Sequence, residues 1–97
     1  MAKTSIRSFR HKGVKKLYRE NDRRGIPADQ VKRLRCGLAA LEGAACPSQI
    51  EGMPGWQLHR LNGAFDGFWS IRINGNWRLV FRFRDGFVCD LDLVDYH

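Results

Sequence analysis

Apolar and polar residues alternate along three runs in the last third of the chain, residues 67–97. The runs are separated by the Asn-Gly-Asn of residues 74–76 and by the Asp-Gly of residues 85–86, which are residue types typical of tight turns. Alternation with a period of two is the pattern of a strand that has one buried face. This region therefore predicts a three-stranded antiparallel meander.

The alternation also predicts the register of the meander. One face collects large apolar residues and should be buried: Trp69, Ile71, Ile73, Trp77, Leu79, Phe81, Phe83, Phe87, Cys89, Leu91 and Leu93. Residues opposite each other in an antiparallel pair share a face, so Ile73 should pair with Trp77 and Phe83 with Phe87. Each hairpin loop would then hold three residues and end on a residue that tolerates the left-handed conformation.

The opposite face of the meander is mostly polar and charged: Ser70, Arg72, Arg78, Val80, Arg82, Asp90 and Asp92. One interpretation is a solvated face on which Arg72 and Arg78 pair with Asp92 across the strands. Each such pair would contribute only a few tenths of a kcal/mol. The other interpretation is a cationic surface that binds phosphate groups through its guanidinium groups.

Two amphipathic helices are predicted ahead of the meander. Residues 11–20 place apolar side chains on one side and basic side chains on the other. A longer helix over roughly residues 27–45 begins at Pro27, where the missing N–H is not needed, and repeats apolar residues at steps of three and four. Its apolar side should cover the apolar face of the meander, and close packing on the sheet would explain Gly37.

Residues 3–9 suit a short strand and residues 56–61 another, whereas the Gly- and Pro-rich segment 46–55 is typical of a surface loop. The resulting order is a strand, two helices and then four strands. It predicts an α+β domain in which two N-terminal helices pack on one face of a mainly antiparallel sheet. Residues 1–97 suffice for one such domain with a single core.

The net charge of +7 on 97 residues indicates a polyanionic partner, either nucleic acid or an acidic protein. The three cysteines, Cys36, Cys46 and Cys89, are odd in number and far apart, which argues against a disulfide framework or a zinc site. We therefore expect a reduced, cytoplasmic protein. We also expect no contact with a membrane, because no run of apolar residues approaches the roughly 18 that a spanning helix requires.

The candidate chemistry lies in His59, Arg78, Asp95, Tyr96 and His97. Imidazoles and a carboxylate can transfer protons, and a guanidinium can hold phosphate oxygens as their charge grows. Together they supply what RNA cleavage requires in the absence of a metal ion. A histidine taken singly is more often a surface residue, so the prediction depends on the set being gathered in one place.

Strict alternation along the last strand would place the candidate catalytic residues on both faces of the sheet. It places Tyr96 on the same face as Arg78, and Asp95 and His97 on the other face. A bend or bulge after Leu93 is needed to bring them together.

Five segments carry a resemblance that covers nearly the whole chain: SFRHKGVKKLYRE, GIPADQVKRLRCGLAALE, PGWQLHRLNG, GFWSIRINGNWRLVFRF and VDYH. In this order and spacing they resemble the HigB-like branch of the RelE-type toxins, also called plasmid maintenance killer proteins. The resemblance implies a RelE-like fold and an mRNA endonuclease that acts on the ribosome, needs neither metal nor other cofactor, and arrests growth. It also implies neutralisation by a cognate helix-turn-helix antitoxin of the HigA type, through which alone the toxin would associate with operator DNA.

The family's functional positions fall on the same five residues. By analogy, Arg78 binds the scissile phosphate, while His97 and Asp95 transfer a proton and orient that transfer. Tyr96 stacks on or orients a nucleotide, and His59 assists as a general acid or base. RNA or ribosome binding is expected of a further group of polar and basic residues: Arg60, Asn62, Arg72, Arg82, Lys12, Lys15 and Lys16.

The chain departs from the family at Asn62, where an HPLKG-like pattern often has a lysine. Asparagine donates a hydrogen bond without a charge, so stabilisation of the transition state should be weaker unless Arg60 or Arg72 supplies the charge. Two other classes of function stay open. A non-catalytic RNA-binding module would use aromatic stacking platforms at Trp56, Phe68 and Trp69, and an interaction protein would use the basic surface to hold an acidic partner.

Overall fold

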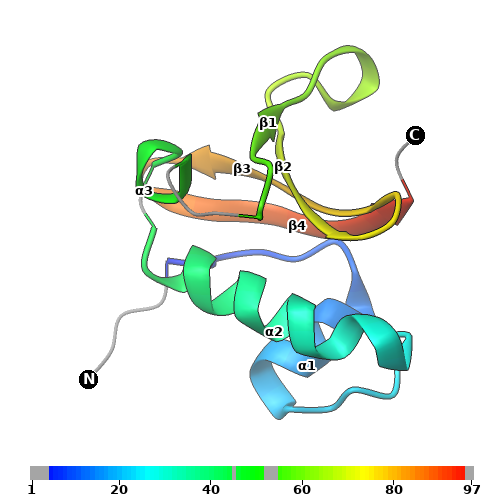
Figure 1. The fold of residues 1–97 in the computed structure, drawn as a ribbon. Helices are drawn as coiled ribbons and strands as arrows, with labels where there is room; N and C mark the ends of the chain where they lie inside the picture. The colour runs from blue at the N-terminus through cyan, green and yellow to red at the C-terminus, as the bar shows by residue number, and fades with distance from the viewer. Residues whose placement is uncertain (1–4, 45, 52–54, 96–97) are drawn as a thin grey trace.

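Helices cover one face of a four-stranded antiparallel sheet in the computed structural model (Figure 1). The structure describes residues 5–44, 46–51 and 55–95. The strands lie side by side in chain order, and their bounds are β1 His59–Arg60, β2 Trp69–Asn74, β3 Trp77–Arg84 and β4 Phe87–Asp95. The predicted α+β architecture, with both long helices on one side of the sheet, is confirmed.

The two predicted helices are α1, Lys12–Glu20, and α2, Ala28–Glu42. The side chain of His11 caps the N-terminus of α1, because its Nδ1 accepts a hydrogen bond from the backbone N–H of Val14 at 3.1 Å. Two short helices were not predicted. The four-residue α3, Ser48–Glu51, lies in the segment expected to be a loop, and the 3-10 turn η1, Gly63–Phe65, follows β1.

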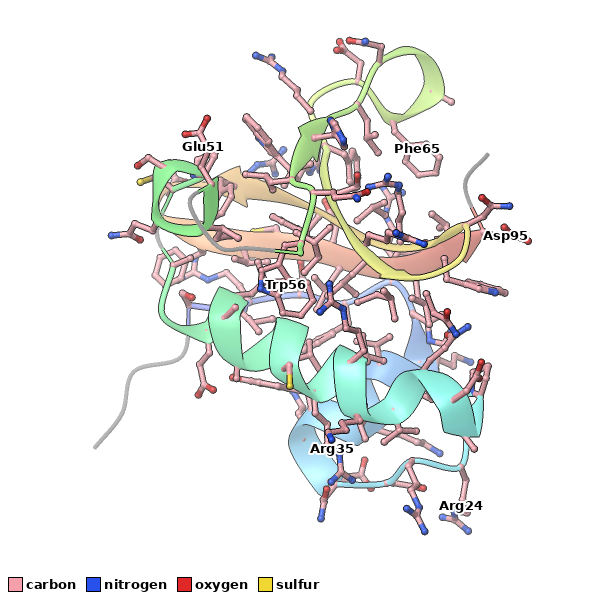
Figure 2. The ribbon with its side chains drawn as sticks, viewed as in Figure 1. Arg24, Arg35, Glu51, Trp56, Phe65 and Asp95 are labelled. Carbon is pink, nitrogen blue, oxygen red and sulfur yellow. The ribbon has the colours of Figure 1, made fainter. Side chains whose placement is uncertain are left out.

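The main core lies between the helices and the sheet. Its fully buried side chains come from both layers and include Val14, Leu34, Leu41, Ile71, Leu79, Phe81 and Leu91. Gly37 lies where α2 packs closely against Trp56 and the sheet, since a Cβ built on it would be 3.2 Å from Ile71 Cδ1 and 3.5 Å from the Trp56 ring. Figure 2 shows Trp56 between α2 and the sheet. The explanation offered for this mid-helix glycine is therefore confirmed.

The first hairpin differs from the predicted register only at its turn. Within the strands, Arg72 pairs with Arg78 as the predicted register requires, but Trp77 pairs with Asn74 and not with Ile73. Ile73 is an extra residue in β2, a β-bulge, and the loop shortens to Gly75 and Asn76. Gly75 takes a φ of 57°, so the glycine makes the tight turn that the prediction had assigned to a longer loop.

The second hairpin also has a two-residue turn, so the predicted pairing of Phe83 with Phe87 is wrong. Arg84 pairs with Phe87, and both turn residues, Asp85 and Gly86, have positive φ values of 53° and 80°. Two consecutive positive φ values are the pattern of a type I′ turn, whose twist matches that of the flanking strands. The local geometry of Asp-Gly therefore decides the register here.

A second bulge in β4 corrects the shift that this turn introduces. Asp90 and Leu91 together oppose the single residue Phe81, and Asp90 has a φ of 55°. Before the bulge Val88 faces the core, so Phe87 and Cys89 lie on the outer face of the sheet, contrary to the prediction. After it the predicted alternation returns.

The two short predicted strands are less regular than expected. From residue 5 onward, where its description begins, the N-terminal segment runs beside β4 with isolated parallel bridges at Ile6 and Phe9. Arg7 N donates a hydrogen bond of 2.8 Å to Val88 O. The strand expected over residues 56–61 is limited to β1, because Gln57 adopts a positive φ of 49° that interrupts the extended backbone.

Candidate functional site

The outer face of the sheet, opposite the helices, carries its own small hydrophobic cluster. Leu61, Phe68 and Val80 are buried there, with Phe65 and Val94 packed against them. The rings of Phe65 and Phe68 meet edge to face at 5.8 Å, and Phe65 extends from η1 toward the sheet (Figure 2). This cluster holds the segment between β1 and β2 against the outer face, which is therefore only partly a solvated surface.

His59 and Arg78 lie on this outer face on either side of Ser70. His59 pairs with Ser70 across the strands, so their side chains share a face. Arg78 donates from Nη1 to Ser70 Oγ at 3.2 Å and to the carbonyl oxygen of Gln57 at 3.4 Å. Ser70 is fully buried, so it provides a fixed anchor for the half-exposed arginine. The structure thus brings together two of the five predicted catalytic residues.

Arg72 lies directly opposite Arg78 on the same face. It donates from Nε to the carbonyl oxygen of Gly75 at 3.3 Å. The predicted cross-strand ion pairs with Asp92 are not formed, because Asp92 pairs with Val80 and its carboxylate accepts a hydrogen bond from the backbone N–H of Leu93. The two-residue turn and the bulge in β4 move Asp92 away from both arginines.

Arg82 is the outer-face arginine that does form an ion pair. Its Nε donates to Asp90 Oδ2 at 2.6 Å, and its guanidinium lies 5.4 Å from the centre of the Phe68 ring. Arg10 approaches the same ring at 5.0 Å. The charge of Arg82 is therefore offset by Asp90, and a role in RNA binding stays a prediction.

Asp95 lies at the end of β4 (Figure 2). It pairs with Trp77, which packs against the main core, so Asp95 shares the helix-covered face of the sheet. It is exposed, and its neighbour Val94 pairs with Arg78. Strict alternation predicted Asp95 on this side, and the structure places it there. The prediction also required a bend or bulge after Leu93, but the bulge in β4 lies before Leu93, at Asp90. Tyr96 and His97 lie outside the described residues.

The predicted RNA-binding residues of the β1 region fall on different sides. Arg60 pairs with Trp69, which packs against the main core. Paired residues share a face, so Arg60 lies on the face of the sheet opposite to that of Arg78. Asn62 is exposed between β1 and η1.

The predicted basic residues of α1 lie in the helix layer, away from His59 and Arg78. Lys12, Lys15 and Lys16 are all exposed, and Lys12 and Lys16 line a hollow together with Arg24. Arg24 donates hydrogen bonds to the Asp22 carboxylate, one of them from Nη2 at 2.9 Å. Hydrogen bonding from Arg24 holds the pKa of the Asp22 carboxyl well below its usual range. These lysines therefore form a second basic surface, separate from the arginines of the sheet.

Metal ligands do not cluster in the part of the chain that the structure describes, where no three His, Cys, Asp or Glu side chains are placed to hold an ion. Cys36, Cys46 and Cys89 are free thiols. Sequence reasoning missed the anchoring role of Ser70. A small polar residue on the outer face, flanked by the positions of His59 and Arg78, was the available signal.

Residues 7–97 match the family described as the RelE-like toxin HigB of type II toxin–antitoxin systems. The chain belongs to this family. It is 37% identical over 92 residues to endoribonuclease HigB of Proteus vulgaris, an alignment that covers 95% of this chain and 99% of that protein. It is 33% identical over 79 residues to toxin HigB-1 of Vibrio cholerae, covering 80% of this chain and 83% of that protein.

A solved structure of the YoeB–YefM complex of Staphylococcus aureus contains a chain with a similar fold. The TM-score is 0.56 at 20% sequence identity, with 95% of this chain and 97% of that chain covered. The predicted RelE-like fold is thus confirmed. As a toxin of a toxin–antitoxin family, the HigB-like chain has an antitoxin as its partner. Among its described helices, none is long and apolar enough to cross a membrane.

Proposed function

We propose that this HigB-like toxin cleaves mRNA on the ribosome, in the cytoplasm, without a metal ion. The endoribonuclease activity itself follows from membership of the family and from 37% identity, over nearly the whole chain, to a protein named endoribonuclease HigB. Dependence on the ribosome and independence of metal ions are the parts that go beyond these comparisons.

One observation carries the proposal: a buried serine fixes the guanidinium of Arg78 beside His59. Fixed donors stabilise developing charge better than mobile ones, because they need no reorganisation when the transition state forms. In the reaction, a base removes the proton of a ribose 2′-OH, and the resulting oxygen attacks the adjacent phosphorus. An acid protonates the leaving 5′-oxygen while Arg78 stabilises the charge on the phosphate oxygens.

We assign the remaining roles to the residues that the family resemblance indicates. His97 and Asp95 transfer a proton and orient the transfer, Tyr96 stacks on a nucleotide, and His59 acts as a general acid or base. Val94 lies opposite Arg78, so β4 ends one residue beyond the level of the phosphate-binding arginine, with Asp95 on the other face of the sheet. The nearness of this strand end to Arg78 supports a catalytic role for the C-terminal residues.

The proposed partner is an antitoxin of the HigA type, with operator DNA bound only through it. The alternative of a non-catalytic RNA-binding module loses its proposed stacking platforms. Trp56 and Phe68 are 8% and 5% exposed, and half-buried Trp69 packs against the main core. Bases stack on exposed rings, so these three side chains do not support that alternative.

Induced expression without an antitoxin tests the proposal directly. We expect growth arrest and new 5′ ends within translated regions of cellular transcripts. A His97→Ala variant should show neither, and a translation inhibitor that empties ribosomes of mRNA should abolish the cuts. Cuts in untranslated RNA at the same frequency would contradict ribosome dependence. Loss of cleavage at a scissile phosphorothioate, restored by Mn²⁺, would contradict the metal-free mechanism.

A further inference from the structure

We infer that Arg72 is a second phosphate-binding residue, which acts with Arg78 as a two-guanidinium clamp on the RNA backbone. The inference rests on the proposed function, since it assigns a substrate contact at the same site. Its basis is the direct pairing of Arg72 with Arg78 across β2 and β3.

The pairing fixes both side chains on one face and close together. Directly opposed residues of antiparallel strands have Cβ atoms roughly 4.5–5.5 Å apart. The two guanidiniums lean in different directions, Arg72 toward Gly75 and Arg78 toward Ser70. Within the described residues Arg72 uses only Nε as a donor, so its terminal N–H groups face no hydrogen-bond partner there. A phosphate that lies over the two strands would accept hydrogen bonds from both groups.

The two positive charges of Arg72 and Arg78 are uncompensated in the described part of the chain, and a bound anion would neutralise them. Like charges directly opposite each other destabilise a sheet. Arg82 on the same face is compensated by Asp90, but neither Arg72 nor Arg78 forms an ion pair with any described carboxylate. A phosphodiester between them would replace repulsion by two attractive, charge-assisted contacts. The uncompensated pair is thus a surface suited to a phosphate group.

Arg60 is the other arginine available to supply a second charge, and its position does not favour it. It pairs with Trp69, whose side chain packs toward the helices, whereas His59 and Arg78 lie on the outer face. Arg72 shares that outer face and is two residues along β2 from Ser70, the partner of His59. It is therefore adjacent to the site without any rearrangement of the strands.

Binding of a non-cleavable RNA tests the inference separately from cleavage. The probe is a short single-stranded oligoribonucleotide with 2′-O-methyl groups throughout, which cannot undergo attack by the 2′-oxygen. We expect Arg72→Gln to weaken its binding about 10-fold to 100-fold, as for loss of a hydrogen bond to a charged group. The slope of log affinity against log salt should fall by about 0.7, the value for one phosphate contact on a single strand.

Arg84→Gln is the matched control, since it removes the same charge from an exposed position at the other end of the same face. It should change binding less than about threefold. The melting temperature separates binding from a structural role: Arg72→Gln should leave it unchanged or raise it, because repulsion from Arg78 is relieved. Arg72→Lys should restore part of the affinity.

Three results would overturn the inference: normal probe binding by Arg72→Gln, equal losses in Arg72→Gln and Arg84→Gln, or a loss confined to Arg60→Gln. Failure of the proposed function has a different signature. In that case the wild-type chain would bind the probe through Arg72 but leave translated mRNA uncut.

Discussion

Asp90 is the extra residue of the β4 bulge, and its carboxylate accepts a hydrogen bond of 2.6 Å from Arg82 Nε. The backbone of Asp90 is left-handed, with a φ of 55°, and its N–H donates to Ser8 Oγ at 2.8 Å. These contacts from β3 and from the N-terminal segment stabilise the bulge. Since the bulge resets the alternation, it determines which later residues of β4 face the core and which face the candidate site.

Substitution of Asp90 should therefore separate backbone strain from the ion pair. We expect Asp90→Ala to lower the free energy of unfolding by about 2 kcal/mol, since alanine loses the partly exposed pair and is costly in the left-handed conformation. Asp90→Gly should cost about 1 kcal/mol less than Asp90→Ala, because glycine adopts that conformation freely. Urea denaturation measures both. Equal losses in the two variants would show that the left-handed backbone is not what makes Asp90 important.

Ser70→Ala should reduce cleavage because it removes the hydroxyl that holds Arg78. We expect about a tenfold lower kcat/KM on ribosome-bound mRNA, as for loss of a single hydrogen bond to a charged group, with little change in melting temperature. Arg78→Gln should cost about a hundredfold or more.

The double variant distinguishes positioning from independent action. If Ser70 works through Arg78, then Ser70→Ala should cause no further loss in the Arg78→Gln background. Additive losses would mean that Ser70 affects cleavage by another route.

Much of the fold was predictable because both helices and the meander have strong, regular apolar patterns. Periodicity gave α1 and α2, the helix-covered face and the central pairing of Arg72 with Arg78. Periodicity did not predict the lengths of the turns or the positions of the bulges. Their conformations depend on single residues with positive φ, such as Gly75 and Asp90, which periodicity does not detect.

The same limit applied to the candidate site. The outer-face positions of Arg72 and Arg78 followed from alternation, but the expected partner Asp92 depended on a register that the second turn shifts. The role of Ser70 was not predictable from pattern, because an anchoring hydrogen bond depends on side-chain geometry across two strands. Asp95 was placed correctly on the side away from Arg78, since no bulge lies between Leu93 and Asp95.

Gly13 in α1 packs against Gly25 in the segment that joins the two long helices. A Cβ at residue 13 would lie 2.7 Å from the carbonyl oxygen of Gly25, which is backbone and cannot easily move. Gly13→Ala should therefore lower the free energy of unfolding by about 1–3 kcal/mol, despite the better helix propensity of alanine. Gly43→Ala is the control, because nothing lies within 4 Å of its Cβ position and its φ is −94°. It should stabilise the chain by about 0.4–1 kcal/mol. Thermal or urea denaturation that gave the same sign for both would refute this packing argument.

Asn62→Lys tests whether Arg72 already provides the charge that the family resemblance leads us to expect from a lysine at position 62. Asn62 is exposed, so the change should alter the free energy of unfolding by less than about 0.5 kcal/mol. In the wild-type background we expect less than a threefold gain in cleavage, because the phosphate already contacts two guanidiniums and a further positive charge near it adds little in water. In the Arg72→Gln background the new lysine should recover about tenfold, since there it replaces a missing charge.

Cleavage rates of the four variants in one reconstituted translation reaction form the required double-mutant cycle. An equal gain from Asn62→Lys in both backgrounds would mean that residues 62 and 72 act independently. The charge at position 72 would then not compensate for the asparagine. A larger gain in the Arg72→Gln background would show that the two positions serve the same phosphate, although they lie on opposite sides of His59 along the strands.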